Sequence, residues 1–230
     1  MIKYVILDAG GVLCYPRMGS WLTTNRFEEV LGQRYKQVPP KELALAMEAE
    51  AKIYLDESLK IDDETMEFVV RRNYFEALSK RLKWELTDRE LNVLARDMTE
   101  YDERYAFYDD TRTGLDTLSD KYTLGLLSDA MPSLKRVFMN AGLLEMFLDV
   151  VISAEIGATK PDKRMYEAIT EKLEAKPEEC IFIDDRECNI QGAIDCGMQG
   201  LLMDREGVKE NSVKDLFEAY RYIEKLNRGE

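Results

Sequence analysis

The feature of this sequence that most constrains its fold is a set of short apolar runs, rich in β-branched residues, that recur along the chain. Each run has the length of a buried strand, and helical patterns separate the later ones. The runs lie at residues 4–7, 122–127, 150–152, 180–183 and, more weakly, 201–203. Strands that alternate with helices require crossover connections. The sequence therefore predicts an α/β fold with a doubly wound, Rossmann-like parallel sheet.

The long segment between the first two predicted strands has a different pattern. It holds no convincing strand, and its apolar residues recur at helical spacing. One expected helix would bury Met66, Val69, Val70, Tyr74 and Leu78. An all-helical block inserted after the first strand of such a sheet predicts a cap. The expected organisation is a catalytic core of residues 1–14 and 100–230 and a helical cap of residues 15–99.

Charge and composition limit the partners. The chain carries 45 acidic and 32 basic residues, a formal net charge of -13. This charge repels nucleic acid and anionic membranes, so we expect neither as a partner. No apolar run has membrane-spanning length and the N-terminus lacks a signal-peptide pattern, which predicts a cytoplasmic protein. No pattern indicates an oligomeric state.

The sequence contains no histidine, and its four cysteines show no CxxC pairing. Catalytic triads with histidine, histidine general bases and histidine-ligated zinc are therefore excluded. Any chemistry must depend on carboxylates, lysine, hydroxyl groups, cysteine or a hard cation.

Polar side chains follow the predicted strands where a shared crevice would lie. Asp8 ends the first strand, Ser128-Asp129 follows the second, and Asp184-Asp185 follows the fourth. Thr159-Lys160 lies between the third strand and its helix. In an open parallel sheet, ligands bind beyond the carboxyl ends of the strands. The sequence thus predicts one site that combines carboxylates, a hydroxyl and an ammonium group.

These segments resemble the four ordered motifs of the haloacid dehalogenase superfamily. The matching segments are Asp8-Ala9-Gly10-Gly11-Val12-Leu13, Leu127-Ser128-Asp129, Thr159-Lys160-Pro161-Asp162 and Phe182-Ile183-Asp184-Asp185. Asn189-Ile190-Gln191-Gly192-Ala193 and Cys196-Gly197-Met198 resemble the family's run after the fourth motif. The resemblance covers the expected core, whereas the cap matches only in position and helical character.

The resemblance implies a role for each position. Asp8 would be the nucleophile that forms an aspartyl-phosphate, and Lys160 would add fixed positive charge. Mg²⁺ would be held by Asp8, the backbone carbonyl of Gly10 and Asp185. Ser128, Asp129 and the backbone of Gly10-Gly11 would contact the phosphate of the substrate. Asp184 and Asn189 would support the lysine or the metal ion.

Two positions depart from the family pattern. Gly10 stands where phosphatases of the family usually carry an aspartate that serves as general acid and base. The loss of such a group is expected to slow turnover by about 10²–10⁴-fold. Asp129 stands where asparagine is usual, and a carboxylate there would repel phosphate unless it is neutralised.

The resulting hypothesis is a Mg²⁺-dependent phosphatase that acts slowly on a small phosphorylated metabolite. One alternative is a dehalogenase in which Asp8 attacks carbon, since halide departure needs no general acid. Another is a catalytically weakened protein that binds a phosphorylated ligand. The physiological substrate does not follow from the sequence.

Overall fold

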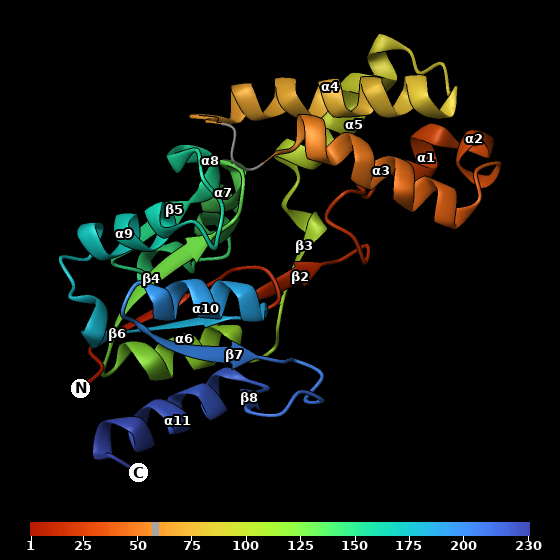
Figure 1. The fold of residues 1–230 in the computed structure, drawn as a ribbon. Helices are drawn as coiled ribbons and strands as arrows, with labels where there is room; N and C mark the ends of the chain where they lie inside the picture. Colours follow the sequence, from red (N-terminus) through yellow and green to blue (C-terminus); the bar gives the residue numbers. More distant parts are fainter. Residues whose placement is uncertain (57–59) are drawn as a thin grey trace.

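A parallel sheet forms the centre of the molecule in the computed structural model, which describes residues 1–56 and 60–230 (Figure 1). Its strands are β1 (Tyr4–Leu7), β4 (Thr123–Ser128), β5 (Asp149–Ile152), β6 (Cys180–Asp184), β7 (Gln199–Met203) and β8 (Ser212–Val213). Their order in the sheet is β5-β4-β1-β6-β7-β8, and every pairing is parallel. The predicted α/β fold with a parallel, doubly wound sheet is confirmed.

Helices cover both faces of the sheet, because neighbouring strand residues point to opposite sides. In β1, Val5 and Leu7 pack into one apolar cluster while Ile6 packs into another. The first cluster includes residues of α6 (Thr111–Ser119), α7 (Ser133–Asn140) and α11 (Leu216–Arg228). The second includes residues of α9 (Lys163–Lys172) and α10 (Glu187–Asp195). The remaining short helices are α8 (Ser153–Ile156), η1 (Asp102–Arg104), η2 (Leu144–Met146) and η3 (Pro177–Glu179).

Between β2 (Cys14–Pro16) and β3 (Tyr105–Phe107), the described residues form five α-helices that lie beside the sheet rather than against its faces (Figure 1). They are α1 (Phe27–Leu31), α2 (Gln33–Lys36), α3 (Pro40–Tyr54), α4 (Glu64–Leu82) and α5 (Asp88–Glu100). Tyr74, Phe75 and Leu94 are among the buried residues of an apolar cluster that these helices share. We call these helices the cap. No helix in the described parts of the chain is both long and apolar enough to cross a membrane.

Local sequence explains where two of the cap helices, α4 and α5, begin. Asp63 accepts a hydrogen bond from the backbone N–H of Met66 (2.8 Å) at the start of α4. Thr87 and Glu90 form a reciprocal capping box at the start of α5. Such side chains satisfy backbone donors that have no partner within the helix. The helical character expected for this segment therefore has a local cause.

The structure differs from expectation at two places in and next to this segment. A two-stranded antiparallel ribbon, β2 (Cys14–Pro16) and β3 (Tyr105–Phe107), connects the cap to the sheet, although no strand was expected at either position. Three-residue strands are too short to show an alternating pattern, and Pro16 argues against one. The expected buried face of α4 is also wrong in part: Met66 is 42% and Val69 49% exposed.

Candidate active site

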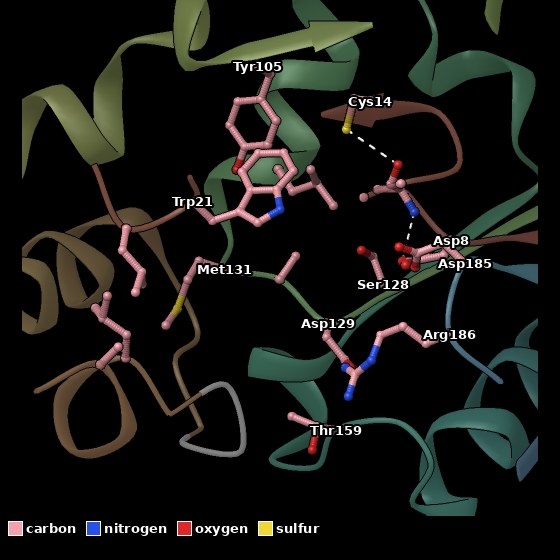
Figure 2. A pocket seen from close by; sticks show the side chains of 18 of the residues that line it. Asp8, Cys14, Trp21, Tyr105, Ser128, Asp129, Met131, Thr159, Asp185 and Arg186 are labelled. Carbon is pink, nitrogen blue, oxygen red and sulfur yellow. Dashed lines mark hydrogen bonds between the residues drawn. The ribbon is translucent and has the colours of Figure 1, made fainter. Parts of the chain in front are cut away.

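The carboxyl ends of the three central strands bring the predicted residues to one edge of the sheet. β1 lies between β4 and β6, so Asp8, Ser128 and Asp184 follow or end adjacent parallel strands. The chain order reverses on either side of β1, which is where open α/β sheets bind ligands. A cavity of about 680 Å³ lies there, between this edge and the cap (Figure 2).

Lys160 holds the centre of this site together. Its Nζ lies 2.9 Å from Oδ1 of Asp8 and 2.7 Å from Oδ2 of Asp184, and it donates to the backbone oxygen of Leu127 (3.2 Å). All three charged side chains are buried. Buried charges are tolerated when they are paired, so one ammonium group between two carboxylates stabilises this arrangement. The predicted meeting of Asp8 and Lys160 is found in the structure.

The same packing shifts the pKa values of the ionisable groups. Burial raises the pKa of Asp8 to about 7, the charge of Lys160 opposes this rise, and that of Asp184 adds to it. For Lys160, burial favours the neutral amine, but the charges of Asp8 and Asp184 outweigh it and raise its pKa. Lys160 therefore stays charged, while Asp8 needs further positive charge to be fully ionised near neutral pH.

Both carboxylate oxygens of Asp184 accept hydrogen bonds from neighbouring groups. Its Oδ2 binds Lys160, and the side-chain amide of Asn189 donates to both of its oxygens at 3.0 Å. The backbone N–H of Arg186 donates to Oδ1 at 2.9 Å. With both oxygens engaged, Asp184 fixes the position of Lys160. Asn189 therefore acts on the lysine through Asp184.

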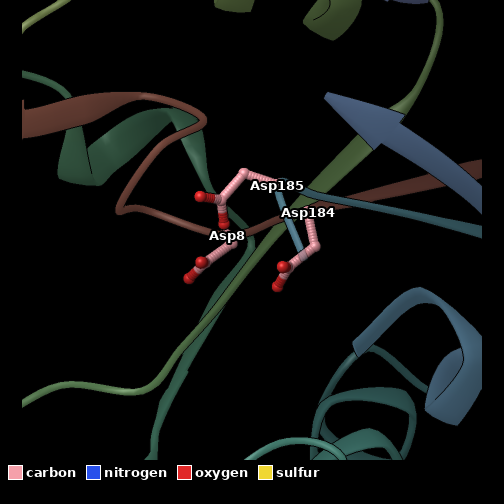
Figure 3. Close-up of side chains that lie close together, drawn as sticks. All are labelled: Asp8, Asp184 and Asp185. Atoms are coloured by element: carbon pink, nitrogen blue, oxygen red, sulfur yellow. The ribbon is translucent and has the colours of Figure 1, made fainter. Parts of the chain in front are cut away.

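The acidic side chains form a set that suits a hard divalent cation. One carboxylate oxygen each of Asp8, Asp184 and Asp185 lies within 4.8 Å of the others (Figure 3). Because Asp184 is already engaged, Asp8 and Asp185 are the two that remain for a metal ion. Burial, followed by the charge of Asp184, raises the pKa of Asp185. A cation between Asp8 and Asp185 would lower both pKa values, and carboxylate oxygens are the ligands that Mg²⁺ prefers.

The turn after β1 leaves space for Asp185. Gly11 has a φ of +71°, a conformation that side chains disfavour. A Cβ atom at this position would lie 2.3 Å from Oδ2 of Asp185. At Gly10, in contrast, a Cβ atom would meet only the ring of Trp21 at an ordinary 3.6 Å. The structure thus requires glycine at position 11 but not at position 10.

Ser128 and Asp129 both line the cavity (Figure 2). Ser128 is 3% exposed at the end of β4. Oδ1 of Asp129 accepts a hydrogen bond from the backbone N–H of Lys160 (2.9 Å) and so braces the loop that carries the lysine. Burial raises the pKa of Asp129, and the charge of Lys160 opposes this rise. The carboxylate of Asp129, which stands where asparagine is usual in the family, therefore has the cationic Lys160 as a neighbour.

Other residues of the cavity were not singled out by the sequence. Trp21 and Tyr105, from the two connections to the cap, contact each other with ring centroids 5.2 Å apart (Figure 2). Arg71 and Arg104 also line the cavity, and Arg186 lies beside Asp129 in Figure 2. The sequence held one signal for Arg71, because a charged residue stands among the apolar positions of α4.

Comparison with known proteins agrees with this fold. The model of the haloacid dehalogenase-like hydrolase family matches residues 2–197. The chain belongs to this family of hydrolases, and the resemblance proposed from its motifs is confirmed. It is 32% identical over 165 residues to the phosphatase MT3486 of Mycobacterium tuberculosis, a match that covers 69% of this chain and 73% of the relative.

Two solved structures share the fold over nearly the whole chain. A HAD phosphatase from Thermococcus onnurineus has a TM-score of 0.62 at 21% identity, with 96% of this chain and 98% of that chain covered. The L-2-haloacid dehalogenase from Xanthobacter autotrophicus has a TM-score of 0.67 at 19% identity, with 97% and 99% covered. At this identity the likeness concerns the fold and does not separate the two activities.

Proposed function

We propose that the protein is a Mg²⁺-dependent phosphatase that acts on a small phosphorylated metabolite through an aspartyl-phosphate at Asp8. The observation that carries this proposal is the position of the buried Asp8 carboxylate, 2.9 Å from Lys160 and beside Asp185, in a cavity of about 680 Å³. A cavity of this volume suits a small molecule. The similarity to a phosphatase of M. tuberculosis supports the same activity.

In the proposed reaction Asp8 attacks the phosphorus atom of the ester. Oδ1 of Asp8 is held by Lys160 and by the backbone N–H of Ala9 (2.7 Å), which fixes the orientation of the carboxylate. A bond forms between the carboxylate and phosphorus while the bond to the leaving oxygen breaks. Water then hydrolyses the acyl-phosphate, which regenerates Asp8 and releases inorganic phosphate.

The other residues would stabilise negative charge around the phosphoryl group. Lys160 supplies a fixed positive charge, and the hydroxyl of Ser128 and the backbone of the Gly10-Gly11 turn would donate hydrogen bonds to phosphoryl oxygens. Mg²⁺, when bound by Asp8, Asp185 and the carbonyl of Gly10, supplies positive charge that reduces the repulsion between carboxylate and phosphate. Asp184 and Asn189 keep Lys160 in place.

Gly10 provides no proton for the leaving group. We therefore propose that the enzyme is slow with esters of basic alcohols and faster with aryl or acyl phosphates, whose leaving groups depart as stable anions. This property also keeps a dehalogenase in consideration, because a halide leaves without a proton. Asp185 favours the phosphatase, since attack on carbon does not need a second carboxylate for a metal ion.

A panel of phosphate esters, tested with and without Mg²⁺, decides among these functions. We expect turnover of aryl and acyl phosphates that EDTA abolishes and Mg²⁺ restores, together with a trapped phosphoryl group on Asp8 detected by mass spectrometry. Metal-independent release of chloride from 2-chloropropionate would favour the dehalogenase. Binding of phosphate esters with neither product would leave the ligand-binding alternative.

A further inference from the structure

Two buried guanidinium groups lie in one wall of the cavity. Arg71 comes from α4 of the cap and Arg104 from the segment that returns to the sheet, and each is only 5% exposed. Both line the same cavity as Asp8 and Asp185. They take no part in the phosphoryl chemistry proposed above. Buried arginines need acceptors or counter-charges, so their partners decide what they do.

Among the described residues, one buried carboxylate, Glu67, contacts Arg71. Its Oε1 accepts from Nε and lies beside Nη2 of Arg71, both at 2.7 Å. Glu67 is itself 0% exposed and also accepts hydrogen bonds from the backbone and hydroxyl of Ser133 at 2.8 Å. Glu67 thus uses one edge of the guanidinium group. Within the described residues, Nη1 of Arg71 has no hydrogen-bond acceptor.

The hydrogen-bond acceptors of Arg104 among the described residues are neutral backbone oxygens. Nη1 donates to the backbone oxygen of Met98 (2.8 Å) and Nη2 to that of Trp21 (2.6 Å). Burial, and next the charge of Arg71, lower the pKa of Arg104 to about 10, although Glu67 and Asp97 oppose the shift. The two arginines therefore repel each other across the cavity wall.

The carboxylates near this wall leave donors of the guanidinium groups without an acceptor. Glu67 contacts one edge of Arg71, and the buried Asp97 acts on Arg104 by its charge, but Arg104 contacts no carboxylate among the described residues. Lys52 and Asp56, which also line the cavity from the end of α3, are less buried and opposite in sign. Buried guanidinium donors that line a cavity and have no acceptor favour binding of an anion there.

We propose that Arg71, assisted by the charge of Arg104, binds a second oxyanionic group of the substrate, either a carboxylate or a second phosphate. The inference rests on the proposed phosphatase function and names its substrate class: a phosphate ester that carries a second anion at its far end. The planar guanidinium group suits such oxyanions because it donates two parallel hydrogen bonds. Trp21, Met131 and Leu134 line the cavity as well and would contact the apolar part of the ester (Figure 2).

A purely structural role of Arg71 is the competing explanation, because the arginine neutralises Glu67. Three variants separate the two roles. Arg71→Gln removes the positive charge but leaves Glu67 buried without a counter-charge. The double variant Glu67→Gln/Arg71→Gln removes both charges and keeps side chains of similar size, so it protects the fold. Glu67→Gln alone keeps Arg71 and makes the wall more positive by one charge.

The test compares 4-carboxyphenyl phosphate with its neutral counterpart, 4-carbamoylphenyl phosphate. For each protein we take the ratio of the kcat/KM values of the two esters. Dividing the ratio of a variant by that of wild type cancels the intrinsic difference between the two leaving groups. We expect the carboxylate preference to fall by about 10-fold or more in Arg71→Gln and in the double variant, mainly through KM. In Glu67→Gln we expect it to rise. 4-Phosphonophenyl phosphate shows which of the two oxyanions the wall prefers.

Binding without turnover provides the second readout. Calorimetry with 4-carboxybenzylphosphonate and its carbamoyl analogue, in the presence of Mg²⁺, should show the same order of preference in wild type and its loss in the double variant. Equal affinities in wild type, or a preference that the double variant keeps, would overturn the inference even if phosphatase activity is present. Carboxylate-selective binding without hydrolysis of any ester would instead refute the phosphatase proposal and retain the anion subsite.

Discussion

The two sides of the cavity are built in different ways. On the core side, Asp8, Lys160 and Asp184 form a closed ionic network at adjacent strand ends. On the other side, Arg71 and Arg104 lie on separate segments, and only Arg71 contacts a carboxylate, Glu67, among the described residues. We therefore expect the core side to carry one type of chemistry and the cap side to select the molecule on which that chemistry acts. Each prediction below tests this division.

Asp8→Asn should have the largest effect. The carboxamide retains the shape of the side chain but is a poor nucleophile, so kcat on aryl phosphates should fall by at least about 10⁴-fold. Steady-state kinetics checks this, with circular dichroism as a control for folding. Retained turnover at a wild-type rate would contradict the assignment of the nucleophile.

Gly11→Ala should reduce kcat/KM by about 10–100-fold and raise the Mg²⁺ concentration needed for half-maximal activity. The reason is that the added methyl group would collide with Asp185 at 2.3 Å. Gly10→Ala is the matched control, because its methyl group meets only Trp21 at 3.6 Å. Magnesium titrations of the two variants provide the measurement. Equal Mg²⁺ requirements would show that Asp185 does not serve the metal site.

Gly10→Asp should raise kcat on alkyl phosphates by about 10-fold or more, because it restores a proton donor beside the leaving group. The cavity has room for this side chain next to Trp21. Activity on acyl phosphates, which need no such donor, is the internal control. A folded variant that shows no gain on alkyl phosphates would indicate that the acid function lies elsewhere.

Leu94→Ala, in the apolar cluster of the cap, should lower the free energy of unfolding by about 2–5 kcal/mol. Leu45→Ala is the control, since Leu45 is 59% exposed and its loss should change stability by less than about 0.5 kcal/mol. Urea denaturation measures both. If the core side carries the chemistry, the folded Leu94→Ala protein should hydrolyse acetyl phosphate within about 3-fold of the wild-type rate, as expected for a change remote from the reacting groups.

Much of the core was predictable because its signals are local. Strand ends such as Asp8 and Ser128 follow apolar runs, and parallel pairing brings those ends together. The short ribbon of β2 and β3 gave no such signal, since three residues show no alternation. The face of α4 was predicted incorrectly at Met66 and Val69, because charged residues occupy its buried side.

The sequence by itself determined the α/β class, the order of the motifs and the absence of histidine chemistry, since these depend on residue types and on spacing along the chain. Tertiary structure alone decided that Glu67 contacts Ser133 across the boundary between cap and core, and that Arg71 and Arg104 share a wall. Helical periodicity shows which residues share one face of a helix. Which neighbour meets that face depends on packing between segments that are distant in the chain, so the specificity of the cavity becomes visible only in three dimensions.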